Sequence, residues 1–144
     1  CPMLEIEVAN RQNRHPIDAD RLVTVARLVL EEEGISRATL SIAVVSDRAI
    51  RQLNRRYLQH DYATDVISFL LDSGIGWISG EIVVSADTAA TQAPQYGLSP
   101  EDELLLYVIH GTLHLVGFDD TTPAARRKMQ ARQRRYLHRL QSPP

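Results

Sequence analysis

Residues 99–116 constrain the fold more than any other stretch, because they predict a helix that is apolar on nearly every side. Ser99 is a typical N-cap, Pro100 suits the first helical position, and the acids that follow complement the helix dipole. A helix without a polar face has to be covered by other elements. The chain therefore needs a sheet and further helices packed around this central helix.

The flanking segments predict the elements that provide this cover. Apolar alternation and β-branched runs predict strands at residues 4–8, 40–45, 66–71 and 81–85. Helical spacing and capping residues predict helices at 18–33, 47–57, 86–95 and 122–140. A loop is predicted at 60–63, and three glycines and Trp77 predict a turn or flexible loop at 72–80. Because strands and helices do not alternate strictly, we expect an α/β (α+β) fold: a single domain over residues 1–144, with a four-stranded mixed sheet and about five helices.

Composition narrows the classes of protein to consider. A chain of 144 residues suits one domain, and it contains no apolar run of 18 residues, so we expect no membrane partner. We also expect no signal peptide. The single cysteine, Cys1, cannot form an internal disulfide, which fits a cytoplasmic location.

Two histidines lie at the end of the predicted central helix. His110 and His114 are four residues apart, so their Cβ atoms lie on one helix face about 5–6 Å from each other. Gly117 can adopt the left-handed conformation that ends a helix, and the returning chain would bring Asp119 or Asp120 toward the same ion. Three protein ligands and a fourth position for water are the arrangement of a catalytic zinc site. Alternatively, the histidines are core residues bonded to backbone, and the aspartates belong to the loop or cap the next helix.

The residue after the first histidine discriminates between metal chemistries. Zinc peptidases of the His-Glu-x-x-His type use that glutamate as general base, and this chain has Gly111 there. A bound ion also lowers the pKa of its water and polarises a phosphoryl oxygen, and arginines can hold a phosphodiester. The pattern therefore favours a nuclease over a peptidase among metal-dependent hydrolases.

The segment from His110 to Asp120 closely resembles the signature of the YbeY family of metal-dependent endoribonucleases, which are rRNA maturation factors. Further blocks resemble the same family in the same order, and together they extend over roughly residues 40–130: Asn54-x-x-Tyr57, Thr64-Asp65-Val66-Ile67-Ser68-Phe69, Gly80-Glu81-Ile82, Gln92-Ala93 and Met129.

The resemblance implies a function and a set of ligands. It implies a cytoplasmic, zinc-dependent endoribonuclease that cleaves single-stranded RNA in 16S rRNA 3′-end maturation and in ribosome quality control. Its partners would be ribosomal RNA and the small ribosomal subunit. The positions of the family's three metal-binding histidines correspond to His110, His114 and Asp120 in this chain. These three residues would hold one Zn²⁺. The nucleophile, water or the RNA 2′-OH, stays undetermined, and so do the catalytic side chains and the oligomeric state.

The chain departs from the family pattern at two positions. Asp120 replaces a neutral imidazole by an anionic oxygen, so the ion with its ligands carries +1 rather than +2, and divalent ions harder than zinc become more competitive. Leu58 stands where the family commonly has an arginine that serves RNA binding or catalysis. Arg55 or Arg56, one turn earlier, substitutes for it as a phosphate-binding group, or both are solvated surface arginines. Thr64, Asp65 and Ser68 either line the cleft or only shape a turn and a strand.

The basic C-terminal segment leaves two interpretations open. Residues 122–144 contain seven basic residues and no acidic ones, although the whole chain carries a net charge of −2. These side chains either contact RNA phosphates or form a solvated basic face. Two other functions also stay open: a non-catalytic ribosome-assembly factor with a structural metal, and a peptidase or other metallohydrolase.

Overall fold

The computed structural model describes residues 3–58 and 64–141. Its strands are β1 (Met3–Asn10), β2 (Arg37–Val45), β3 (Val66–Gly74) and β4 (Trp77–Ser85). Its helices are α1 (Ala19–Glu32), α2 (Asp47–Leu58), α3 (Ala86–Gln92), a 3₁₀ turn η1 (Ala93–Tyr96), α4 (Pro100–Leu115) and α5 (Pro123–Gln141). No helix in these two ranges is both long and apolar enough to cross a membrane. The predicted loop at residues 60–63 lies outside the described residues.

The four strands form one mixed sheet in the order β1-β2-β4-β3. β1 pairs in parallel with β2, and β2 pairs in parallel with β4, so Ile6, Leu40 and Gly80 lie in one row across the sheet. β3 is antiparallel to β4 and forms the other edge. The predicted fold class, a four-stranded mixed sheet with five α-helices, is confirmed.

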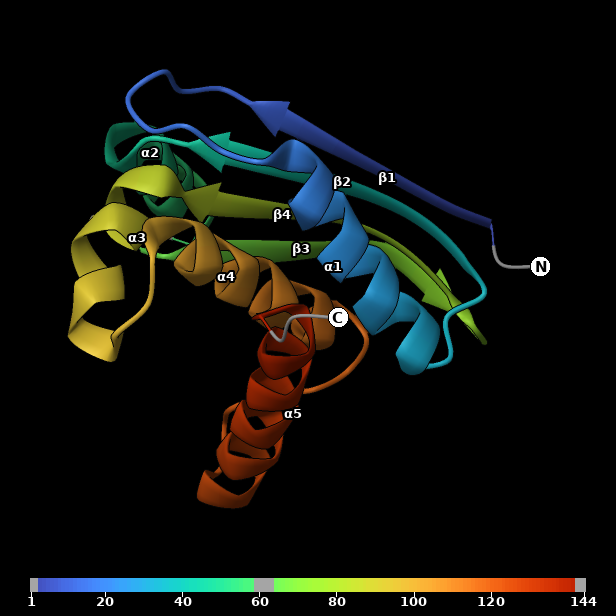
Figure 1. The fold of residues 1–144 in the computed structure, drawn as a ribbon. Helices are drawn as coiled ribbons and strands as arrows, with labels where there is room; N and C mark the ends of the chain where they lie inside the picture. The colour runs from blue at the N-terminus through green and yellow to red at the C-terminus, as the bar shows by residue number, and fades with distance from the viewer. Residues whose placement is uncertain (1–2, 59–63, 142–144) are drawn as a thin grey trace.

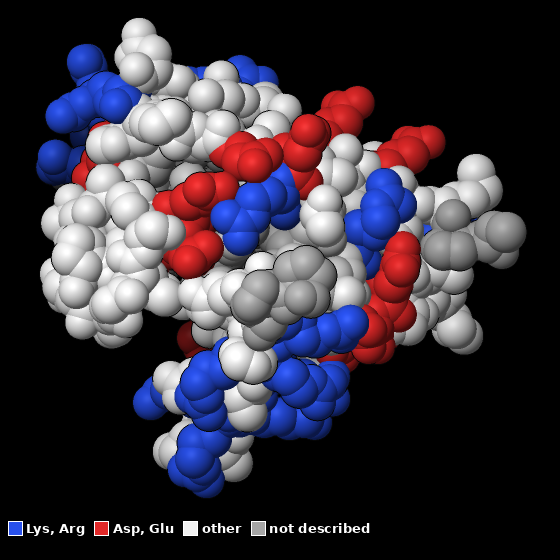
Figure 2. All heavy atoms as spheres, in the orientation of Figure 1, with Lys and Arg blue, Asp and Glu red and all other residues white. Residues whose placement is uncertain are grey.

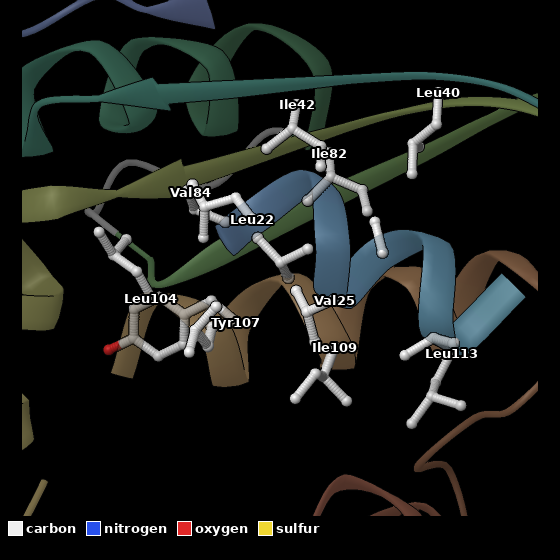
Figure 3. Close-up of a cluster of buried hydrophobic side chains, with 14 of the residues drawn as sticks. Leu22, Val25, Leu40, Ile42, Ile82, Val84, Leu104, Tyr107, Ile109 and Leu113 are labelled. Atoms are coloured by element: carbon white, nitrogen blue, oxygen red, sulfur yellow. The ribbon is translucent and has the colours of Figure 1, made fainter. Parts of the chain in front are cut away.

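The helices cover the two faces of the sheet unequally, as Figure 1 shows. α1 and α4 pack on one face, where Leu22 and Val25 meet Ile42, Ile82 and neighbouring aliphatic residues in the main core (Figure 3). On the opposite face, the shorter α2 inserts its Ile50 into a smaller cluster. The alternation of side chains along β2 and β4 supplies both clusters.

Two glycines allow α4 to approach the sheet closely. A Cβ atom on Gly111 would lie 3.0 Å from Ile82 Cγ2 and 3.1 Å from Ser68 Oγ. A Cβ atom on Gly80, in β4, would lie 2.9 Å from Leu115 Cδ1. Because neither side chain exists, the last turns of α4 press directly on β3 and β4. This contact fixes the position of the two histidines relative to the sheet.

The segment predicted as a turn or flexible loop at residues 72–80 contains a turn, but a much shorter one, and the loop alternative is wrong. β3 continues to Gly74 and β4 begins at Trp77, so only Ile75 and Gly76 form the turn of a hairpin. Gly76 has a φ of 75°, the left-handed conformation that glycine adopts without strain in such turns. Trp77 therefore belongs to a strand, where Arg37 stacks over its ring at 5.1 Å from the centroid.

α5 is fastened to the end of α1 by a charged cluster. Glu33 Oε2 accepts hydrogen bonds from Arg132 Nη1 at 2.6 Å and from the hydroxyl of the buried Tyr136. Beside this cluster, Arg139 pairs with Glu32 at 2.9 Å. α5 also packs against α4, where Gln133 reaches His110 and Gln141 donates to Asp102 at 3.0 Å.

Candidate functional site

The chain reverses direction directly after α4. Gly117 has a φ of 111°, as its predicted role as a helix terminator requires. The Phe118 amide donates to the Leu113 carbonyl at 3.0 Å and the Gly117 amide donates to the His114 carbonyl at 3.2 Å, the two bonds of a Schellman motif. The turn places the Phe118 carbonyl against the histidine side chain, where it accepts a hydrogen bond from His114 Nδ1 at 3.1 Å.

His110 is held from a different helix. Its Nδ1 lies 2.7 Å from Gln133 Oε1, on α5, and the ring is half-buried. Gln133 is not among the residues that the sequence pattern predicted for the site, because it lies 23 residues beyond its histidine. Only the docking of α5 on α4 brings the two together.

These two hydrogen bonds set the tautomers of the rings. A carbonyl or amide oxygen only accepts, so Nδ1 carries the proton on both His110 and His114. Nε2 then keeps its lone pair on each ring. Metal-binding histidines characteristically donate their second ring N–H to such an oxygen, which orients the ring and makes it a better ligand. Both imidazoles therefore fit a zinc ion.

The two aspartates after the turn have different surroundings. Asp119 Oδ1 accepts from the backbone amide of Thr121 at 3.2 Å and from its hydroxyl at 2.9 Å. The bond from the Thr121 amide, more than any other factor, holds the pKa of Asp119 below its usual range. Asp119 thus serves its own loop, whereas Asp120 lines a cavity together with His110.

This cavity has a volume of about 360 Å³ and lies between α4, α5 and the start of β3. Its wall includes His110, Gln133 and Asp120, together with Arg126 and Asp65. His114 is exposed and does not line it. Among residues 3–58 and 64–141, no three His, Cys, Asp or Glu side chains lie close enough together to hold an ion. The convergence of Asp120 with both histidines on one ion stays a prediction.

The arginines predicted to bind phosphate lie elsewhere. Arg55 and Arg56 are in the last turn of α2, on the opposite face of the sheet, and neither lines the cavity. Arg56 stacks over Tyr57 at 5.4 Å from the ring centroid. Arg126 is the arginine in the cavity wall, and its Nη2 donates to the Asp120 carbonyl at 3.4 Å. Phosphate binding by Arg55 or Arg56 stays a prediction, and the side chain of Leu58 lies outside the described residues.

The upstream residues divide between the cavity and the sheet. Asp65 lines the cavity and accepts from the Val66 amide at 2.8 Å, at the start of β3. Thr64 donates only weakly to Asp65, at 3.4 Å. Ser68 donates to the Gly111 carbonyl at 3.3 Å and so ties β3 to α4. Asp65 therefore fits both predicted roles, and Ser68 is a packing contact.

The surroundings of Gly111 bear on peptidase chemistry. The position faces Ile82 and Ser68 on the sheet. A glutamate there would be directed into β3 and β4 and away from the cavity. The general base of the His-Glu-x-x-His arrangement therefore has no place in this helix.

Lys and Arg side chains gather over α5, as Figure 2 shows. Part of this basic face is structural, because Arg132 and Arg139 pair with Glu33 and Glu32. Arg132 and Lys128 also lie 5.5 and 5.6 Å from the ring centroid of Phe118, which joins α5 to the turn after α4. The remaining basic side chains of α5 either contact RNA or are solvated.

A model of the protein family described as endoribonuclease YbeY matches residues 7–141 of the chain. The chain belongs to the YbeY family. It is 39% identical over 137 residues to the endoribonuclease YbeY of Chlorobaculum tepidum, a match that covers 95% of this chain and 98% of that protein. The endoribonuclease YbeY of Salinibacter ruber is 39% identical over 144 residues, with 92% of each chain covered.

A solved structure has the same YbeY-like fold. The solution structure of a Thermotoga maritima protein matches with a TM-score of 0.63 and 26% sequence identity, and it covers 94% of this chain and 87% of the other. The family resemblance stated from the motifs is therefore confirmed, and it extends beyond residues 40–130 to nearly the whole chain.

Proposed function

We propose that this chain is a zinc-dependent endoribonuclease that cleaves single-stranded RNA at the cavity beside His110. The names of its relatives, endoribonuclease YbeY in each case, support RNA cleavage. The observation that carries the proposal is the pair of hydrogen bonds that leaves Nε2 of both His110 and His114 free for a metal. Asp120, in the cavity wall, is the third proposed ligand.

A bound zinc ion would supply a water of lowered pKa and a Lewis acid for a phosphoryl oxygen. The residues of the chain supply the rest. Gln133 and the Phe118 carbonyl hold the two imidazoles in orientation. Arg126, in the same wall as Asp120, is placed to pair with a phosphate oxygen of the bound strand.

The basic face of α5 extends this site toward a longer strand. Arg127, Arg134 and Arg135 are exposed on α5, which borders the cavity. Each RNA phosphate that these arginines neutralise would make the affinity for RNA decrease more steeply with salt concentration. We propose that the natural substrate is the 3′ end of 16S rRNA, processed in the cytoplasm during maturation and quality control of the small ribosomal subunit.

Cleavage of a labelled single-stranded RNA by the zinc-loaded protein tests this function. We expect His110→Ala and His114→Ala to abolish cleavage, while His138→Ala, an exposed histidine of α5, keeps it. A double-stranded RNA of the same sequence should stay intact. Equal cleavage by wild type and His114→Ala would refute the assignment of the metal ligands. No cleavage by any form, with zinc bound, would leave a structural role for the metal.

A further inference from the structure

The floor of the cavity contains two buried polar groups without partners. Glu103 and Tyr107 lie one turn apart on α4, and their side chains are only 2% and 4% exposed. The two groups lie close enough for each to shift the pKa of the other, but neither Glu103 Oε1 nor the Tyr107 hydroxyl makes a hydrogen bond of good geometry in the part of the chain that the structure describes. Figure 3 shows the Tyr107 ring among the aliphatic residues of the core, with its hydroxyl directed away from them. Buried polar groups in native proteins are normally satisfied, so two such groups lining one cavity point to a ligand.

The charges around this floor indicate what kind of group the ligand presents. Among the residues that the structure describes, the cavity is lined by three acids, Glu103, Asp65 and Asp120, and by one arginine, Arg126. A phosphate would be repelled at the floor, whereas a neutral group with N–H donors would be bound. The Tyr107 hydroxyl is protonated at neutral pH and can donate, and burial raises its pKa further. Burial also raises the pKa of Glu103, so its carboxyl group is the ionised acceptor only at a pH above that raised value. The floor therefore presents a carboxyl acceptor beside a hydroxyl donor.

The rim of the cavity adds a stacking surface. Tyr96, at the end of η1, lines the cavity and is 67% exposed. Large aromatic side chains at the rim of a polar cavity are typical stacking partners for unpaired bases. The cavity volume of about 360 Å³ is at the small end of ligand sites, which suits one nucleotide.

We propose that this cavity is a nucleobase subsite that selects guanine in single-stranded RNA. Guanine alone among the four bases places two adjacent donors, N1–H and N2–H, next to an acceptor, O6, on its pairing edge. The two donors match the Glu103 carboxylate, and O6 matches the Tyr107 hydroxyl. Adenine and cytosine would each direct a ring-nitrogen lone pair at the carboxylate, and uracil offers one donor. His110 lines the same cavity, so the selected base would lie beside the cleaved phosphate; this inference rests on the proposed function.

Nucleotide binding tests the subsite without cleavage. We would titrate the zinc-loaded protein with GMP, IMP, AMP, CMP and UMP and follow binding by calorimetry. IMP lacks the N2 amino group and is otherwise identical to GMP. We expect GMP to bind at least about tenfold more tightly than IMP and the other three nucleotides, because a bidentate pair discriminates by that order. Glu103→Gln should remove the preference for GMP over IMP, and Glu101→Gln, an exposed residue of the same helix, should keep it.

The RNA assay then separates this inference from the proposed function. Oligonucleotides that differ in a single base should be cleaved beside guanine by wild type, and without preference by Glu103→Gln or Tyr107→Phe. Cleavage without base preference, with GMP and IMP bound equally, would overturn the guanine subsite and leave the endoribonuclease intact. Selective GMP binding without any cleavage would support the subsite and overturn the function. A loss of bound zinc in Glu103→Gln, with base selectivity unchanged, would assign the floor to a cation and overturn the inference.

Discussion

The cluster around Glu33 should carry a large part of the energy that docks α5. The Glu33 carboxylate is 10% exposed, and it accepts from Arg132, which is 31% exposed, and from the fully buried Tyr136. Glu33→Ala would leave the Tyr136 hydroxyl buried without an acceptor and Arg132 without its counter-ion. Because α5 carries Gln133, the loss should also reach His110.

The expected loss of stability in each variant follows from how deeply the interacting groups are buried. Hydrogen bonds to a charged group contribute about 1.5–3 kcal/mol each, so Tyr136→Phe should cost an amount in this range. Breaking a buried ion pair costs about 3–5 kcal/mol, and the partial exposure of Arg132 places Glu33→Ala near the lower end, about 3 kcal/mol. A domain is stable by only about 5–15 kcal/mol, so this is a substantial fraction. Because the ion pair of Glu32 and Arg139 is exposed, we expect Glu32→Ala to lower the free energy of unfolding by only about 0.2–1 kcal/mol.

Urea unfolding followed by circular dichroism measures these differences. The free energy of unfolding would be compared for wild type, Glu33→Ala, Tyr136→Phe and the double variant, with Glu32→Ala as the matched control. We expect the double variant to lose about 1–2 kcal/mol less than the sum of the single losses, because both changes remove the same hydrogen bond. Strict additivity, or an effect of Glu33→Ala no larger than that of Glu32→Ala, would refute the reasoning.

Three further predictions concern single side chains. Gln133→Leu should weaken zinc binding about 10- to 100-fold, measured by chelator competition, because His110 loses the acceptor for its Nδ1–H; unchanged zinc affinity would contradict this role. The hydrogen bond from the Asp47 backbone amide, and to a smaller extent that from His15, holds the pKa of Asp87 below its usual value of 3.8. Asp87→Asn should therefore lower the free energy of unfolding near pH 6, and this loss relative to wild type should vanish as pH falls through the lowered pKa. A loss that persists in strong acid would argue against this linkage. Burial raises the pKa of Glu103 above 4.5, so the folded state binds the extra proton and stability should fall as pH rises from 4.5 through the raised pKa; Glu103→Gln should lack this fall in pH-dependent unfolding.

Local signals in the sequence predicted the elements that depend on local chemistry. Ser99 accepts from the Asp102 amide at 3.1 Å and Pro100 begins α4, as the capping pattern indicates. Asp18 caps α1 in the same way by accepting from the Arg21 amide at 3.2 Å. Gly117 ends α4 in the predicted left-handed conformation. In each case the decisive partners lie within a few residues of one another.

The failures occur where the decisive partner is remote in sequence. The glycines between residues 72 and 80 are typical of a loop, but pairing of β4 with β2 and β3 extends this segment into a hairpin. Trp77 contributes to this, because its indole lies across the strand pair over Gly74, where a Cβ atom would meet it. The spacing of apolar residues within the segment does not indicate this strand pairing or the contact between Trp77 and Gly74.

The site shows the same division. The spacing of His110 and His114 identifies the two histidines as a pair on one helix face. The group that accepts from Nδ1 is close in sequence for His114, where it is the Phe118 carbonyl, and remote for His110, where it is Gln133. Glu103 fits a helix N-terminus by sequence, as one more acid that complements the dipole. Its burial at the floor of a cavity depends on how α4 packs, and no local rule distinguishes it from its exposed neighbour Glu101.

Location of the metal tests the account most directly. Crystals of the zinc-loaded protein should give one anomalous peak at the zinc edge, about 2.0–2.2 Å from Nε2 of His110, Nε2 of His114 and a carboxylate oxygen of Asp120. Gln133 and the Phe118 carbonyl should keep their bonds to the two Nδ1 atoms. A zinc peak that lacks either histidine, or no peak at full zinc occupancy in solution, would contradict the proposed centre.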